Sequence, residues 1–108
     1  MNMKRYKYIH RLVEKITTSP SNNMEFSCYG HLVSLESGTD GYVSVTVYHT
    51  TDRYSGELAD FSFDYWTHEL YVEYTEDERL FDAIVRAFRD IYAGRGFSVS
   101  RCEDEEEV

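Results

Sequence analysis

The residues with the clearest chemical potential are carboxylates gathered in the middle of the chain. Between Glu36 and Glu78 there are eleven Asp or Glu side chains and a single basic residue, Arg53. A second acidic run occupies residues 103–107. Because carboxylates accept paired hydrogen bonds from guanidinium groups as phosphates do, this pattern indicates a surface that binds basic side chains. The terminal run alone is more typical of a solubilising tail.

Other chemistry has weaker support. His31, His49 and Asp52 are potential metal ligands, but their spacing matches no established metal site. Residues 52–57 lack the alternating oxygen ligands of a calcium loop. No Ser-His-Asp or Cys-His grouping and no glycine-rich phosphate loop is present. We therefore expect no enzyme, no cofactor and no bound metal.

Length and charge indicate one domain with an uneven charge distribution. The 108 residues carry a net charge of −9, yet residues 1–20 hold five basic side chains and one acid. We expect a single domain over 1–101 and a disordered acidic tail over 102–108. Cys28 and Cys102 show no ligand spacing and are expected to be free thiols, with a single bridge between them left open. Without an apolar leader or a membrane-length run, we expect a cytoplasmic protein.

Two helices are expected at the ends of the domain. The first covers 2–17, where apolar residues recur every three or four positions, and Pro20 follows it. The second opens at 75–78, with Thr75 as the capping residue and Glu78 completing a capping box. It has a broad apolar stripe and stops before Gly94.

Between the helices the pattern predicts four antiparallel strands. They cover 25–36, 42–50, 58–65 and 69–74. In the first strand the apolar residues change from even-numbered positions, at Met24, Phe26 and Cys28, to odd-numbered ones, at Val33 and Leu35. This change of parity predicts a bulge near Gly30. Residues 97–100 could add a short strand. The expected architecture is α+β, a four-stranded antiparallel sheet with both helices on one face and the other face open.

The third and fourth strands are expected to bring acids together on the open face. The register that keeps Phe61 with Val72 and Phe63 with Leu70 places Asp64 opposite Glu69 and Asp60 opposite Glu73. Like charges directly opposite destabilise a sheet by up to about 1 kcal/mol per pair, and we expect that only a cationic partner would relieve them. Carboxylates two residues apart on a strand would lie ~6.6 Å apart, close to twice the axial charge spacing of one DNA strand. The expected partner-binding residues are Asp60, Asp64, Glu69, Glu73, Tyr71, Tyr48, Tyr42, Asp52 and Glu57, with Tyr29 a further candidate and Tyr74 assigned to the core.

This order of helix, antiparallel strands, helix and strongly acidic remainder resembles the small phage-encoded anti-CRISPR inhibitors. It also resembles other nucleic-acid mimics, including some anti-restriction proteins. The resemblance lies in layout and charge, and no sequence motif carries it. It implies a non-enzymatic monomer, acting in the host-cell cytoplasm, that occupies the basic groove or PAM-reading arginines of an RNA-guided nuclease and blocks DNA competitively. The layout of a double-stranded-RNA-binding domain is rejected because Glu76, Asp77 and Glu78 open the long helix.

Two other functional classes share part of this pattern. An immunity protein or antitoxin that neutralises a cationic toxin would use the same electrostatics, and its gene would neighbour that of the toxin. An accessory interaction subunit would form a homodimer through the open face. In each case we expect a protein partner, with no direct nucleic-acid binding and no membrane contact.

Overall fold

The protein is described by a computed structural model over residues 7–18, 24–38 and 41–102. It is an α+β fold with two helices and one six-stranded mixed sheet. The elements in chain order are α1 (Lys7–Thr18), β1 (Met24–Cys28), β2 (His31–Ser37), β3 (Tyr42–Tyr48), the short 3₁₀ turn η2 (Arg53–Ser55), β4 (Glu57–Asp64), β5 (Glu69–Thr75), α2 (Glu78–Ile91) and β6 (Ser98–Arg101).

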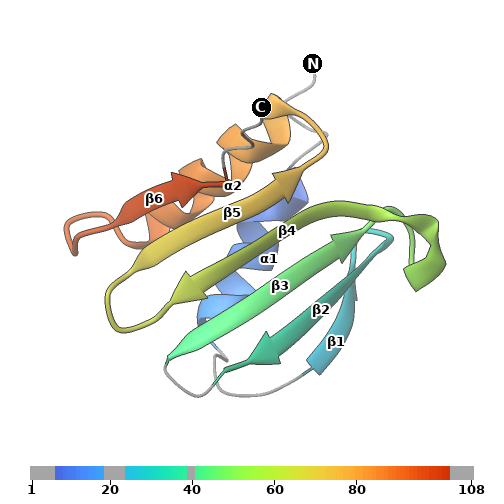
Figure 1. Cartoon of the computed structure of the whole chain (residues 1–108), viewed down its shortest axis with the longest axis horizontal. Helices are drawn as coiled ribbons and strands as arrows, with labels where there is room; N and C mark the ends of the chain where they lie inside the picture. The colour runs from blue at the N-terminus through green and yellow to red at the C-terminus, as the bar shows by residue number, and fades with distance from the viewer. Residues whose placement is uncertain (1–6, 19–23, 39–40, 103–108) are drawn as a thin grey trace.

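The strands follow one another across the sheet in sequence order (Figure 1). β1 to β5 are antiparallel to their neighbours, whereas β6 pairs with β5 in parallel. The predicted four-stranded antiparallel sheet is therefore wrong in strand number and in the direction of one strand, whereas the short strand considered for residues 97–100 is present as β6. The parallel strand follows from α2, because a helix between two strands returns the chain to the starting edge and allows the same direction.

The first predicted strand is in fact a hairpin. Cys28 lies opposite His31, and Tyr29 and Gly30 form the two-residue turn with φ values of 52° and 83°. Positive φ at both central residues is the geometry of a tight hairpin turn. The turn folds β2 back on β1 and brings Phe26 opposite Val33. The change of parity near Gly30 thus marks a reversal of the chain, and the predicted bulge is wrong.

Both helices lie on one side of the sheet and cover its apolar face (Figure 1). The buried side chains come from β2–β5 and from both helices, and include Ile9, Leu12, Ile16, Val33, Val45, Phe61, Phe63, Leu70, Ile84 and Phe88. The ring of Phe63 lies 4.6 Å from that of Phe88 and 5.2 Å from that of Tyr92, which joins the middle of the sheet to α2. The prediction that both helices share one face is confirmed.

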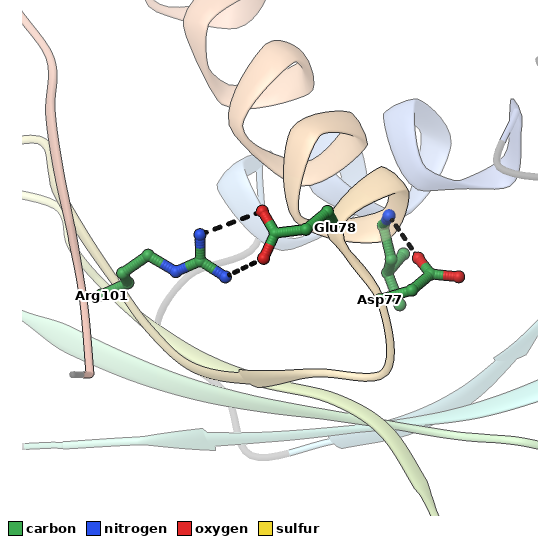
Figure 2. A network of polar contacts seen from close by, with 4 residues as sticks. Asp77, Glu78 and Arg101 are labelled. Carbon is green, nitrogen blue, oxygen red and sulfur yellow. Dashed lines mark hydrogen bonds and ion pairs between the residues drawn. The ribbon is translucent and has the colours of Figure 1, made fainter. Parts of the chain in front are cut away.

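The capping residue of α2 lies two residues later than predicted. Thr75 still pairs with Ala59 in the sheet, so it cannot cap the helix. Asp77 is the capping residue, and its Oδ1 accepts a hydrogen bond of 2.9 Å from the backbone N–H of Leu80 (Figure 2). The helix ends at Ile91, and Gly94 follows with a φ of 80°.

The two ends of the predicted domain are described only in part. The predicted first turn of the N-terminal helix and the acidic run 103–107 lie outside the described residues. Cys102, assigned to the tail from sequence, donates its amide to Val72 O at 2.9 Å and extends the ladder of β6. Among the described residues no helix is long and apolar enough to cross a membrane.

Candidate functional site

The side of the sheet turned away from the helices, here called the open face, gathers the acids of the strands. β1 to β5 contain seven carboxylates and neither lysine nor arginine. These are Glu25, Glu36, Glu57, Asp60, Asp64, Glu69 and Glu73. Six of them have register partners that alternate with the buried apolar positions, and these six lie on the open face. The seventh, Glu73, has no register partner, but it is exposed and lies close enough to raise the pKa of Asp60.

Rows of small hydroxyl side chains cross the open face between the acids. One row runs Glu36, Ser44, Ser62, Tyr71 and Ser100, and the next runs Glu25, Ser34, Thr46, Asp60 and Tyr74. The middle of the open face is therefore polar, with Asp60 among the hydroxyl side chains.

Asp60 is one of two half-buried acids among the described residues, and Asp64 is the other. Asp60 lies opposite Thr46 on β3 and opposite Tyr74 on β5. Burial first, and then the negative charges of Glu57 and Glu73, raise the pKa of Asp60, while a hydrogen bond with the Thr46 side chain acts the other way. Asp60 is thus an acid whose charge is costly in the free protein.

The predicted pairing of Asp60 with Glu73 is wrong. The register between β4 and β5 shifts between Asp60 and Phe61, so Glu73 becomes an extra residue on β5 and Tyr74 takes the position opposite Asp60. An extra residue on one strand is a β-bulge, and it turns Tyr74 outward to 48% exposure. The predictions that Tyr74 faces the core and that Glu73 directly opposes Asp60 both fail for this reason, although Glu73 still acts on the pKa of Asp60.

The predicted pairing of Asp64 with Glu69 is confirmed. However, Asp64 Oδ1 accepts hydrogen bonds from the backbone N–H groups of Trp66, at 2.8 Å, and Thr67, at 3.1 Å. These donors stabilise the charge of Asp64 within the chain itself. The inference that only a cationic partner could relieve this pair is therefore wrong, and Glu69 is the more exposed carboxylate of the two.

Two charged residues near η2 have structural partners. Arg53 reaches from this turn to β1 and forms an ion pair with Glu25. Asp52, predicted as a binding residue, lies in the loop and accepts a hydrogen bond of 2.9 Å from the N–H of Tyr54. Asp52 therefore caps the turn and does not belong to the strands of the open face, unlike Glu57, which β4 carries opposite Tyr48.

The predicted tyrosines divide between the open face and its ends. Tyr42, Tyr48 and Tyr71 lie in register with Asp64, Glu57 and Ser62, and so belong to the open face. A hydrogen bond with the Cys102 side chain raises the pKa of Tyr71. Tyr29 instead lies in the first hairpin turn, with its ring 6.2 Å from that of Tyr8 on α1. Three of the four tyrosines considered are thus brought together with the acids.

Trp66, a large exposed aromatic side chain in the β4–β5 turn, was not identified from the sequence. Trp66 is 72% exposed and directly follows the last residues of β4. A lone tryptophan in a predicted turn beside acids is a signal that could have identified it, because exposed tryptophan is enriched at protein interfaces.

The histidines considered as metal ligands have other partners. His31 Nδ1 lies 3.0 Å from Tyr48 O, and its ring stacks on Tyr8 at 4.6 Å. His49 Nε2 lies 3.8 Å from Glu76 Oε1. Within the described ranges no group of three or more His, Cys, Asp or Glu side chains is placed to hold a metal ion.

The described cations outside Arg53 lie on or beside the helices. Arg11 and Lys15 are exposed on α1, and Arg79, Arg86 and Arg89 are exposed on α2. The two layers of the molecule thus differ in charge, with an acidic sheet face and a mixed helix face.

Comparison with protein-family models, curated proteins and solved structures gives no significant match for this chain.

Proposed function

We propose that the protein is a non-enzymatic inhibitor of an RNA-guided nuclease. Its open face binds the basic surface with which the nuclease holds nucleic acid. It acts as an acidic mimic that competes with DNA. The observation that carries this proposal is the presence of seven carboxylates and no lysine or arginine in β1 to β5. The proposal places the protein as a monomer in the cytoplasm, where its target acts.

Charge segregation supports a cationic partner. A face of one sign raises the rate of encounter with an oppositely charged surface and orients the approach. The helix layer carries cations among its acids, so it would not compete for the same partner. Because exposed charges are screened over ~8–10 Å at physiological ionic strength, the association should weaken as salt is added.

The spacing of the acids defines what kind of mimic is proposed. Asp60 and Asp64 are four residues apart on β4, as are Glu69 and Glu73 on β5, so the strand rise separates each pair by roughly 13 Å. Neighbouring strands add rows ~4.8 Å away. This differs from the ~6.6 Å spacing expected from sequence. The face therefore offers a distributed acidic patch and does not reproduce one continuous row of phosphates.

Two charge-matched variants test the proposal. Glu57→Gln, Glu69→Gln and Glu73→Gln together remove three exposed charges from the open face. Glu14→Gln, Asp82→Asn and Asp90→Asn remove three exposed charges from the helix layer. Each protein serves as bait in a lysate of the cells in which the gene occurs, at low and high salt, and captured proteins are identified by mass spectrometry. Duplex DNA is then added as competitor.

The proposal predicts that wild type and the helix-layer variant capture the same nuclease, released by salt and by duplex DNA, while the open-face variant loses it. Equal capture by both variants would refute it. A captured cationic toxin that duplex DNA does not displace would instead identify an immunity protein. A homodimer in sedimentation that is lost in the open-face variant would indicate an accessory subunit.

A further inference from the structure

The exposed indole of Trp66 is held on a firmly braced turn. Asp64 Oδ1 accepts hydrogen bonds from the Trp66 and Thr67 amides, and the His68 amide donates to Asp64 O at 2.8 Å. On the inner side the Tyr65 hydroxyl donates to Ile16 O on α1. A side chain displayed on a rigid turn loses less conformational entropy when it binds.

The orientation of the indole leaves one flat side open. A Cβ placed on Gly41 would lie 2.8 Å from Trp66 Cδ2 and 2.9 Å from Cε2, the two atoms shared by its fused rings. Contact at the shared bond means that the ring lies with its flat side over Gly41. Since Trp66 remains 72% exposed, the opposite flat side faces solvent. Tyr42, the next residue after Gly41, is 42% exposed beside it.

A carboxylate lies in the same row of the sheet as Tyr42, because Tyr42 pairs with Asp64 and Asp64 pairs with Glu69. Glu69 follows the same turn, is exposed, and lies opposite Asp64 in the sheet. No described lysine or arginine forms an ion pair with Glu69. Asp64, by contrast, already accepts two hydrogen bonds from the turn. Tyr42, Trp66 and Glu69 together form what is here called the Trp66 corner of the open face.

We infer that the Trp66 corner binds an arginine side chain of the protein partner, an assignment that rests on the proposed function and narrows it to an arginine-bearing surface. A guanidinium is planar, so it can stack on the free side of the indole while its N–H groups donate to a carboxylate. An ammonium is a compact point charge without that planar fork. The geometry therefore distinguishes arginine from lysine, which the acidic face alone does not.

Charge complementarity excludes the other occupants of such a platform. A nucleic-acid base would also stack on an exposed tryptophan, but its phosphates would meet Asp60, Glu69 and Glu73. A second copy of this chain would bring an equally acidic face against the first. A cationic protein surface meets neither obstacle.

The test uses two peptides of equal length, oligoarginine and oligolysine. Trp66 is the only tryptophan of the chain, so intrinsic fluorescence reports directly on the Trp66 corner. Affinities are measured by titration calorimetry at low salt for wild type, Trp66→Leu and Tyr54→Leu. Tyr54 is the matched control because it is 90% exposed near η2, away from the β4–β5 turn.

The inference predicts that oligoarginine binds wild type about fivefold tighter than oligolysine and changes the Trp66 fluorescence more strongly. Trp66→Leu should reduce the oligoarginine affinity to that of oligolysine, and Tyr54→Leu should alter neither. Equal affinity for the two peptides, or an equal loss for both in Trp66→Leu, would overturn it. The fluorescence comparison needs no substitution and remains decisive if Trp66→Leu folds poorly.

Failure of the inference can be told apart from failure of the proposed function. If both peptides bind without preference, and the Glu57, Glu69 and Glu73 triple variant loses both, the acidic face is active and only the arginine assignment falls. If neither peptide binds at low salt, both proposals are refuted. Self-association that Trp66→Leu abolishes would assign the corner to a second copy and overturn the inference.

Discussion

Arg101 at the end of β6 binds Glu78 in the first turn of α2 through both arms of its guanidinium. Nη1 lies 3.1 Å from Oε1, and Nη2 lies 2.8 Å from Oε2 (Figure 2). The same guanidinium lies 3.8 Å from the ring centre of Phe81. The last strand is therefore attached to the start of the helix that precedes it, as well as to β5.

Arg101→Lys should loosen β6 without unfolding the protein. Lysine keeps the charge but cannot make the two-armed bond or the planar stack. We expect hydrogen exchange at the amides of β6 to rise several-fold, with β2 and β3 unchanged, and Arg86→Lys to have no effect.

The effect of Arg101→Lys should also depend on pH. Arg101 lowers the pKa of Glu78, so the stabilisation is present above the unfolded pKa of about 4.3 and is lost as pH falls through the lower folded value. The difference between the two proteins should shrink as pH falls below about 4.3 and disappear once pH is below the lower folded pKa of Glu78. A difference that persists there would contradict the ion-pair explanation.

Asp60→Asn should stabilise the free protein at neutral pH. Burial and the charges of Glu57 and Glu73 raise the pKa of Asp60, so its ionised form is unfavourable in the folded state. We expect a gain of up to about 1 kcal/mol, or roughly 4–8 °C in Tm. Because a raised folded pKa costs stability only above the unfolded value of about 3.9, the gain should vanish near pH 4.

Asp82→Asn, on the exposed side of α2, is the control for Asp60→Asn because it removes one charge without altering the open face. Thermal melts between pH 3 and pH 8 separate the two variants. A lower Tm for Asp60→Asn at neutral pH would show that the hydrogen bond with Thr46 outweighs the charge.

Tyr65→Phe should destabilise the fold by about 1 kcal/mol, because it removes the hydroxyl that donates to Ile16 O and leaves that carbonyl without this donor. Tyr54→Phe, at an exposed position, should leave Tm unchanged. Burial raises the pKa of Tyr65 far above its usual range. Wild type should therefore lose stability as pH rises above about 10, and Tyr65→Phe should lose less over the same range.

Cys28 and Cys102 should never form an intramolecular disulfide. They lie at opposite edges of the six-stranded sheet, so five interstrand steps place them roughly 24 Å apart, whereas a bridge needs Cα atoms within ~7 Å. Burial raises the pKa of Cys28, and Cys102 is exposed. Titration with a thiol reagent should show one fast and one slow group, and Cys102→Ser should abolish the fast one. A faster-migrating monomer on a non-reducing gel would disprove the separation.

Strong periodicity made much of the fold predictable. The alternation of Val43, Val45 and Val47 and the stripe of α2 gave the correct elements and the correct buried faces. The parity change between Cys28 and Val33 correctly marked an irregularity near Gly30. It was not recognised as a tight turn because tyrosine rarely adopts the positive φ that Tyr29 has here. The direction of β6 depends on where α2 packs, which no local pattern in residues 98–101 records.

The candidate site was predictable in composition and less so in geometry. Alternation placed Asp60, Asp64 and Glu69 on the open face correctly. The bulge at Glu73 was not visible, because Val72, Glu73 and Tyr74 alternate as in a regular strand and only the ladder hydrogen bonds reveal the extra residue. The capping role of Asp64 likewise depends on how the turn folds, which its residue type alone does not fix.

The sequence-ordered sheet has a consequence for how the chain folds. Each antiparallel strand pairs with the strand made just before it, so the first four pairings are local and need only short loops to close. Local contacts of this kind favour fast folding. α1 is the exception, because it packs against α2, which lies some sixty residues later in the chain. During synthesis α1 and the hairpins are made before α2, so the core is completed only once α2 has been made and packs against them.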